Sequence, residues 1–196
     1  MNLSIISYNA GNTRSVSFAL ERLGIHATVT ADPEVIAASD KVIFPGVGEA
    51  SSAMQHLAQS GLDRLIPSLK QPVLGICLGM QLLCRHSEEG DTKALGIFPV
   101  EVKKFRTNDP AMKVPQMGWN TISALKGPLF NGVPENAYVY YVHSFYAEQC
   151  EDTAAVTNYI LPYSAALWKE NFYAVQFHPE KSGVAGELIL RNFLSL

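Results

Sequence analysis

The chain of 196 residues has few cysteines and lacks any long uninterrupted apolar run. Its three cysteines are odd in number and form no CxxC pair, which argues against a disulfide framework and a structural zinc site. The apolar stretches end well short of the ~18 residues that span a bilayer. The N-terminal residues lack the basic leader and apolar core of a signal peptide. We therefore expect a soluble, cytoplasmic protein that needs no metal or cofactor.

Positive charge is also scarce. Lysine and arginine number 15 against 18 acidic residues, which gives a net charge of −3 and no electrostatic footprint for nucleic acid. The only basic cluster, residues 103–106, is interpreted as a solvated strand edge rather than a phosphate-binding patch. With 47% apolar and 17% charged residues the composition is globular, and the length predicts one domain over residues 1–196.

The first half of the chain alternates between short apolar runs and amphipathic segments. Strands are expected at 3–8, 27–31, 41–45 and 72–76, and helices at 13–23 and 49–60. This alternation is typical of a doubly wound parallel sheet, which binds ligands beyond the carboxyl ends of its strands. We therefore expect the loops at 9–12, 45–49 and 77–79 to share one rim.

The second half is richer in strand signals. The expected elements are strands at 96–105, 137–149, 165–169 and 172–178, a hairpin turn at 169–171 and a final helix at 184–195. No internal repeat, low-complexity linker or domain boundary is visible. Together the halves predict an α/β fold.

Residues 75–79 read Gly-Ile-Cys-Leu-Gly where a strand is expected to become a helix. This G-x-nucleophile-x-G pattern is typical of a nucleophile elbow, because glycines two residues away let strand and helix fold closely together. Cys77 would lie at the helix N-terminus, which favours a thiolate, and the Leu78 amide would stabilise an oxyanion. The alternative is a buried structural cysteine beside packing glycines, and the pentapeptide alone does not separate the two.

A nucleophilic thiolate needs a base, and the base needs a group that orients it. His178 fits this role, because it ends an apolar strand, is held extended by Pro179 and precedes Glu180 by two residues. We expect His178 to reach Cys77 while Glu180 holds the other imidazole nitrogen. The other histidines are interpreted as surface residues, for His26, His56 and His86, and as a lining or core residue, for His143.

Pro-Gly-Val-Gly at 45–48 directly follows an expected strand. Two glycines at the carboxyl end of a strand favour a loop that approaches a ligand or changes the orientation of a peptide. On the shared rim the loop would neighbour Leu78, so the Val47 N–H is expected to complete an oxyanion hole. The alternative is an ordinary turn.

The segments PGVG, GICLGMQLL and QFHPEKS together resemble class I, triad-type glutamine amidotransferases. AGNTRSV, PQMGWN and YYVHSFY are further similar to the branch that forms the glutaminase subunit of imidazole glycerol phosphate synthase. The motifs are spread from residue 8 to residue 193, so the resemblance covers essentially the whole chain. It implies a flavodoxin-like open mixed sheet flanked by helices, with additional antiparallel β-strands in the C-terminal half.

The resemblance also implies a reaction that uses no cofactor. Cys77 attacks the side-chain carboxamide of glutamine, His178 protonates the departing ammonia, and water then hydrolyses the γ-glutamyl thioester. Glu180 completes the triad. The positions that correspond to glutamine-binding residues are Gly48, Gln81, Glu89, Ser144 and Phe145, the last two through backbone groups.

A partner follows from the resemblance as well. It is a (β/α)₈-barrel cyclase subunit, which receives the ammonia through a channel and makes imidazole glycerol phosphate and AICAR in histidine biosynthesis. Positions matching the heterodimer interface are Asn12, Trp119, Tyr140 and Lys181, for which local packing or a solvated side chain is the alternative. The first loop departs from the family pattern at Ser7, Asn9 and Thr13.

Three other functions compete with this interpretation. The first is the glutaminase component of another synthetase. The PQMGWN segment is the feature that distinguishes this chain from that group. The second is a standalone cysteine peptidase or deglycase on a related scaffold, which would not need a glutamine pocket. The third is a non-catalytic interaction module, against which the intact set of Cys, His and Glu argues.

Overall fold

The computed structural model describes residues 1–8 and 12–196. The helices are α1 (Thr13–Arg22), α2 (Pro33–Ala37), α3 (Ala50–Ser60), α4 (Leu62–Leu65), α5 (Leu78–Leu83) and α6 (Gly183–Ser195). The strands are β1 (Leu3–Ile6), β2 (Thr28–Thr30), β3 (Lys41–Gly46), β4 (Val73–Cys77), β5 (Cys84–Ser87), β6 (Thr92–Lys93), β7 (Phe98–Lys104), β8 (Gln116–Thr121), β9 (Tyr138–His143), β10 (Phe145–Ala147), β11 (Thr153–Tyr159), β12 (Leu161–Lys169) and β13 (Phe172–Val175). Within these described ranges no helix is long and apolar enough to cross a membrane.

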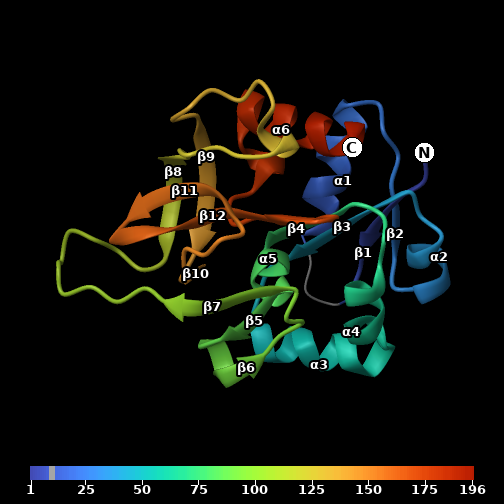
Figure 1. The fold of residues 1–196 in the computed structure, drawn as a ribbon, viewed down its shortest axis with the longest axis horizontal. Helices are drawn as coiled ribbons and strands as arrows, with labels where there is room; N and C mark the ends of the chain where they lie inside the picture. Colours follow the sequence, from blue (N-terminus) through green and yellow to red (C-terminus); the bar gives the residue numbers. More distant parts are fainter. Residues whose placement is uncertain (9–11) are drawn as a thin grey trace.

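A large mixed sheet organises the described strands in the order β2-β1-β3-β4-β13-β12-β10-β7-β5-β6, with β11 paired to β12. From β2 to β13 neighbouring strands are parallel. Antiparallel pairing begins between β13 and β12, and β8 and β9 form a separate antiparallel pair. The predicted α/β fold, with a mixed sheet and additional antiparallel strands in the C-terminal half, is therefore confirmed (Figure 1).

Helices cover both faces of the parallel part of the sheet (Figure 1). Successive strand residues point to opposite faces. Ile5 and Ile43 accordingly pack with α1 and α6, whereas Ile6 and Phe44 pack with α3 and α4. Because both faces are buried, these strands have the near-continuous apolar runs from which they were predicted.

Local sequence sets the ends of the helices. The side chains of Asp32 and Glu49 cap α2 and α3 by accepting hydrogen bonds from backbone N–H groups. The chain leaves α1 through Gly24 and α3 through Gly61, both with positive φ. The two helices predicted in the first half are confirmed.

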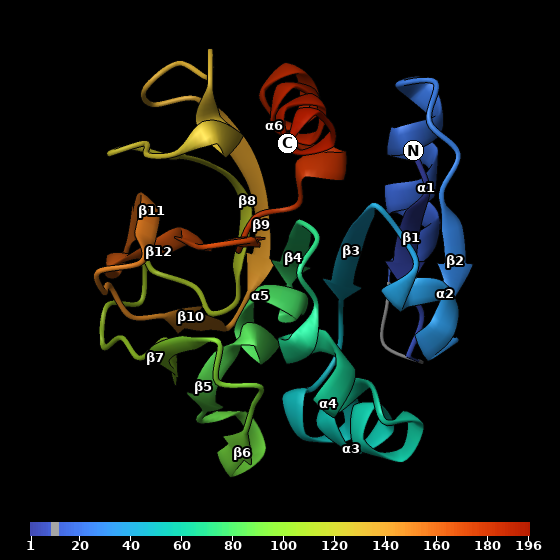
Figure 2. The same cartoon turned by 45° about the vertical axis from the view of Figure 1, so that its right-hand side comes forward.

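Three predictions in the β-rich half are corrected. The segment 137–149 is not one strand: β9 pairs with β8, β10 joins the main sheet, and the chain changes sheets at Ser144 (Figure 2). The last strand ends at Val175 and does not reach residue 178. The basic residues 103–106 are not at an edge, because β7 lies between β10 and β5 and Phe105 is buried. In addition, β5, β6, β8 and β11 were not predicted.

The chain folds back tightly where β4 becomes α5. A methyl group on Gly79 would collide with the carbonyl of Phe44 in β3, and one on Gly75 would lie 2.7 Å from Leu83 Cδ1. Residues without a Cβ are therefore required for α5 to lie directly against β3 and β4. This is the steric role that the sequence predicted for the two glycines.

We expect Gly79→Ala to destabilise the protein by about 2 kcal/mol, because the added methyl meets a backbone carbonyl that has no room to yield. Urea unfolding would measure the loss. Gly24→Ala is the matched control: its φ is positive but the space around a Cβ is open, so it isolates a conformational cost of roughly 1 kcal/mol. A Gly79→Ala protein as stable as Gly24→Ala would contradict the close packing of α5.

Candidate active site

Three neighbouring parallel strands, β3, β4 and β13, bring their carboxyl ends to one edge of the sheet. Gly46 at the end of β3 is in register with Cys77 at the end of β4. The loops at 45–49 and 77–79 therefore share a rim, as predicted. Residues 9–11 of the third predicted loop lie outside the described residues.

Cys77 occupies the turn between β4 and α5 in a strained backbone conformation. Its φ of 56° and ψ of −111° are rare for a residue other than glycine. The residue is 6% exposed, and its Sγ lies 3.7 Å from Gln176 Nε2 and 3.9 Å from the Val142 carbonyl oxygen. A strained residue between a strand and a helix N-terminus has the geometry of a nucleophile elbow.

His178 and Glu180 form the buried pair that the sequence predicted. The imidazole Nδ1 lies 2.8 Å from Glu180 Oε1, and the two side chains are 2% and 1% exposed. Because a carboxylate only accepts hydrogen bonds, Nδ1 carries a proton. The other ring nitrogen, Nε2, has no hydrogen-bond partner among the described residues. Asn12 Nδ2 donates to the same Glu180 oxygen at 3.2 Å.

Two neighbours control the protonation of His178. Burial lowers its pKa, but the interactions with Cys77 and Glu180 outweigh burial and raise the pKa to about 10. The ring therefore holds a proton readily beside the thiol. A thiolate next to a protonated imidazole can attack a carbonyl carbon, and the imidazole can then protonate the leaving amine.

Backbone bonds from β9 hold the turn that carries this pair. The His178 N–H donates to the Tyr140 carbonyl at 2.9 Å, and the Tyr140 N–H donates to Ser182 Oγ at 3.0 Å. Ser182 Oγ in turn donates to the His178 carbonyl at 2.6 Å. Since β13 has already ended at Val175, β9 rather than β13 positions the imidazole.

A cavity of about 310 Å³ opens beside Cys77, at the small end of the ~300–1,000 Å³ typical of small-molecule sites. Its wall contains every predicted oxyanion and glutamine-binding residue: Val47, Gly48, Leu78, Gln81, Glu89, Ser144 and Phe145. Pro115, Val142 and His143 also line it. Residues from five separate parts of the chain thus converge on the cysteine.

The sequence of this chain matches a known family over almost its whole length. Residues 5–196 match the model of glutamine amidotransferase class-I. The chain belongs to the class I glutamine amidotransferase family.

Within this family, individual proteins are similar to the amidotransferase to different degrees. The imidazole glycerol phosphate synthase subunit HisH of Bacteroides fragilis (strain YCH46) is 61% identical over 196 residues, 100% of both chains. HisH of Haemophilus influenzae (strain ATCC 51907) is 46% identical over 195 residues, 99% of this chain and 97% of the relative. A solved structure from Thermoplasma acidophilum, provisionally named as one subunit of GMP synthase, has a TM-score of 0.77 and 21% identity over 100% of this chain and 92% of that one. That last likeness concerns the fold alone.

Gln81 of this amidotransferase links the cavity wall to Cys77. Its Nε2 donates to the Phe145 carbonyl at 3.0 Å and to Gln176 Oε1 at 2.9 Å, and Gln176 Nε2 approaches the sulfur of Cys77. Gln176 was not among the predicted site residues. The signal was present, because an amide inside the apolar run FYAVQF has to find polar partners once it is buried.

His143 supports the same wall as a neutral ring. Its Nδ1 donates to the Phe145 carbonyl at 2.7 Å, and its Nε2 lies 3.2 Å from the Tyr163 hydroxyl. Burial, together with the charge of His178, lowers the pKa of His143 to about 4. A neutral histidine engaged at both nitrogens is not available to take a proton, which leaves His178 as the candidate base.

Glu89 brings a carboxylate to the cavity from the single turn η2 (Glu89–Asp91). Its Oε2 accepts a hydrogen bond from the Ala50 N–H at the start of α3, at 2.9 Å. Burial raises the pKa of Glu89, and the charge of Glu49 adds to the rise. The carboxyl group is therefore a structural link to α3 that also faces the cavity.

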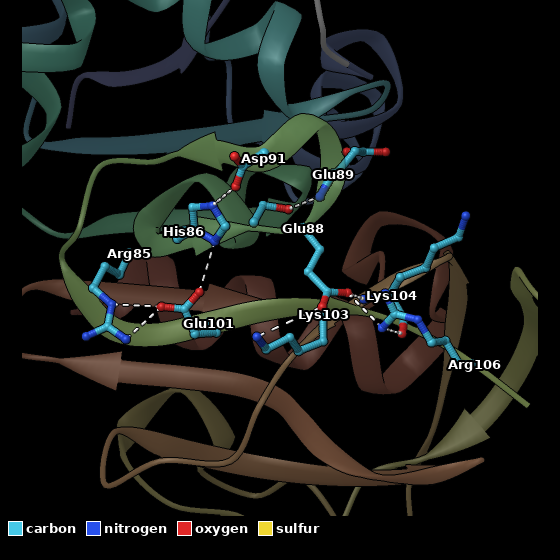
Figure 3. Close-up of polar contacts among 10 residues, drawn as sticks. Arg85, His86, Glu88, Glu89, Asp91, Glu101, Lys103, Lys104 and Arg106 are labelled. Atoms are coloured by element: carbon cyan, nitrogen blue, oxygen red, sulfur yellow. Dashed lines mark hydrogen bonds and ion pairs between the residues drawn. The ribbon is translucent and has the colours of Figure 1, made fainter.

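A charged network fastens the η2 turn to β7 (Figure 3). His86 bridges Asp91 and Glu101 at 2.8 and 3.0 Å, and Glu88 pairs with Arg106 at 3.0 Å. His86 was interpreted as a plain surface residue, but it is partly buried and ties two strands together. The network therefore fixes both ends of the η2 turn, which places the Glu89 carboxylate in the cavity.

The four predicted interface residues gather around His178 and Glu180. Trp119 on β8 meets the Tyr140 ring edge-on at a centroid distance of 5.9 Å and is 55% exposed. Lys181 Nζ lies 5.8 Å from the same ring. Asn12 reaches Glu180 from the start of α1. All four residues therefore contact the His178–Glu180 pair, directly or through the Tyr140 ring.

We expect Glu180→Gln to slow glutamine hydrolysis by about 100-fold or more, because an amide does not hold and stabilise the protonated imidazole as a carboxylate does. The same change should lower the pKa of His178, measured from its ring signals in an NMR titration. Glu187→Gln, which alters a half-exposed carboxylate paired with Arg191, is the matched control. An unchanged His178 titration in Glu180→Gln would show that the carboxylate does not control the ring.

The raised pKa of His178 also sets a pH dependence of stability. Because the folded state binds the proton more tightly than the unfolded state, the protonated ring stabilises the fold fully below pH 6.5 and loses this effect as the pH rises towards about 10. The stability advantage of the wild type over His178→Gln should therefore shrink across this interval in urea unfolding. A difference that grows with pH would contradict the raised pKa.

Proposed function

We propose that this chain is the glutaminase subunit of an imidazole glycerol phosphate synthase. It hydrolyses glutamine to glutamate and ammonia. The observation that carries the proposal is the elbow cysteine with its buried His178–Glu180 pair, beside a small-molecule cavity. It occurs in a chain that is 46–61% identical over nearly its full length to proteins named as this subunit.

Each chemical step has a group in this site. The Cys77 sulfur attacks the carboxamide carbon, and the backbone N–H groups of Val47 and Leu78 stabilise the oxyanion. His178 protonates the departing ammonia, which leaves a γ-glutamyl thioester on Cys77. His178 then takes a proton from water as the water attacks the thioester, and glutamate and the thiol are released.

The cavity residues suit the two charged ends of glutamine. Glu89 supplies a negative charge for the α-ammonium group. One of its oxygens accepts a hydrogen bond from the start of α3, and the other is assigned to the substrate. Both Nε2 hydrogens of Gln81 are used inside the protein, so its Oε1 is the atom assigned to the substrate. The carbonyls of Ser144 and Phe145 also accept protein bonds. Their N–H groups, with that of Gly48, are therefore assigned to the α-carboxylate.

The ammonia passes to a (β/α)₈-barrel cyclase subunit in a heterodimer, where imidazole glycerol phosphate and AICAR are formed. Asn12, Trp119, Tyr140 and Lys181 are assigned to this interface. Exposed apolar side chains extend the same region, namely Met117 on β8, Tyr138 on β9 and Val184 at the start of α6. We further propose that residues 1–196 act as one domain in the cytoplasm, where the free cysteines would stay reduced.

The competing functions are less well supported. A glutaminase of another synthetase would not be expected to share 46–61% identity with HisH proteins over nearly the full chain. A standalone cysteine hydrolase has no need of Glu89 and Gln81 in the cavity, nor of an exposed Trp119 beside the triad. A non-catalytic module has no need of a strained Cys77 next to a raised-pKa histidine.

We expect the isolated chain to release glutamate from glutamine slowly. With its cyclase partner and that partner's nucleotide ligand, release should be at least about 10-fold faster. The reason is that the loop at 45–48 can exist in two arrangements, and a ligand that binds more tightly to one of them raises its population. The measurement is glutamate formation with and without the pair. Cys77→Ala is the control and should abolish the signal. Glutamate release that persists in Cys77→Ala, or that ignores the partner, would overturn the proposal.

We expect Trp119→Ala to raise the Kd for the cyclase partner by about 10-fold or more, since an exposed aromatic at an interface centre is typical of a binding hot spot. Isothermal titration calorimetry would measure the change. Val29→Ala on β2, the end strand of the main sheet and similarly exposed, is the matched control and should bind as the wild type does. Equal affinities for the two variants would place the interface elsewhere.

A further inference from the structure

Tyr8, just after β1, buries a hydroxyl group that has no hydrogen-bond partner in the described part of the chain. The residue is 5% exposed, and its ring packs against Phe44 of β3 at a centroid distance of 5.2 Å. Buried tyrosine hydroxyls usually find a partner, because an unpaired one has lost its bonds to water without replacement. The catalytic steps assigned to Cys77 and His178 do not use this group.

The hydroxyl lies where the two sources of the oxyanion hole meet. A Cβ built on Gly46 would collide with the Tyr8 hydroxyl oxygen, and the same point is 2.9 Å from Leu78 Cβ and 3.0 Å from the Gly79 nitrogen. The tyrosine therefore touches the backbone of the Pro-Gly-Val-Gly loop at its passage over the start of α5. No side chain on Gly46 intervenes.

The hydroxyl is a neutral donor close to the nucleophile. Burial raises the pKa of Tyr8, and the charge of Cys77 raises it further. The group thus keeps its proton beside a thiolate and has one hydrogen bond to give. The carbonyl of Gly46 belongs to the residue that the hydroxyl already contacts.

We propose that Tyr8 is a positioning residue for the oxyanion hole, donating its hydroxyl hydrogen to the Gly46 carbonyl when the Gly46–Val47 peptide turns its N–H toward the substrate. A planar peptide moves its carbonyl and its N–H together, so the turn gives the carbonyl a new direction and a need for a donor. Glycines on both sides of Val47 permit the turn. This inference rests on the proposed glutaminase function.

The proposal explains why the hydroxyl is unpaired. A bond that exists in only one of two arrangements shifts the equilibrium towards that arrangement. With the loop as it stands, Tyr8 gains nothing from its hydroxyl, whereas in the turned arrangement the bond holds the Val47 N–H on the substrate side. Removing the hydroxyl should therefore affect catalysis and spare the stability of the free protein.

The test is Tyr8→Phe in the complex with the cyclase partner and its nucleotide ligand. We expect kcat for glutamine to fall about 10-fold, less than the 10²–10³ lost with a direct oxyanion donor, and KM to stay within about two-fold. The melting temperature of the free chain should not fall. Tyr141→Phe is the matched control: its hydroxyl is paired with Thr157 at 2.6 Å, so we expect the reverse, a lower melting temperature and an unchanged kcat.

Two probes of Cys77 separate the oxyanion hole from the thiol. Iodoacetamide alkylates the thiolate without forming an oxyanion. The rate of Cys77 alkylation should therefore be the same in Tyr8→Phe as in the wild type. Glutamate γ-semialdehyde accepts the Cys77 sulfur at its aldehyde carbon, whose oxygen becomes the oxyanion of a thiohemiacetal, and should bind about 10-fold more weakly. Slower alkylation, or an unchanged semialdehyde affinity, would overturn the role of Tyr8. A wild type that neither hydrolyses glutamine nor binds the semialdehyde would instead overturn the proposed function.

Discussion

The contact between Gly79 and the Phe44 carbonyl is the constraint on which the active site depends. Because no Cβ separates them, α5 begins directly over the ends of β3 and β4. That placement forces Cys77 into its strained turn and sets the Leu78 amide beside the Pro-Gly-Val-Gly loop. A larger residue would have to lift the helix, and the thiol and amide would move together. The strain at Cys77 is thus held by packing from both neighbours rather than by the cysteine itself.

His178 is held in a different way. The elbow is built by residues adjacent in sequence, whereas His178 is fixed through the backbone of Tyr140, a residue of the small β8–β9 sheet. The outer face of that sheet carries the exposed Trp119. Any protein that binds to this face contacts the sheet that contains β9, whose Tyr140 carbonyl accepts the hydrogen bond from His178. A small rearrangement of β9 therefore has a direct physical route to the triad, without movement of the main sheet.

Much of this arrangement could be predicted from sequence, and the failures have a common cause. The parallel strands were visible as apolar runs, and the elbow was visible because its glycines and cysteine are local. The break at Ser144 was not, since β9 and β10 are continuous in apolar pattern and differ only in their partners. Gln176 and Tyr8 were missed for the same reason. Gln176 contacts a residue about a hundred positions away in the sequence, and Tyr8 packs against a residue of a neighbouring strand.

Unpaired buried polar atoms concentrate around Cys77. Among the described residues, five buried side-chain atoms lack a hydrogen-bond partner, and three of them are Tyr8 Oη, His178 Nε2 and Glu180 Oε2. A fold normally pairs such atoms, because each unpaired one costs about 1–3 kcal/mol. Their clustering is tolerable only if the missing partners arrive with the reaction. In the proposed reaction the protonated Nε2 of His178 finds its partner in the departing amine, and the Tyr8 hydroxyl finds its own in the Gly46 carbonyl of the turned loop.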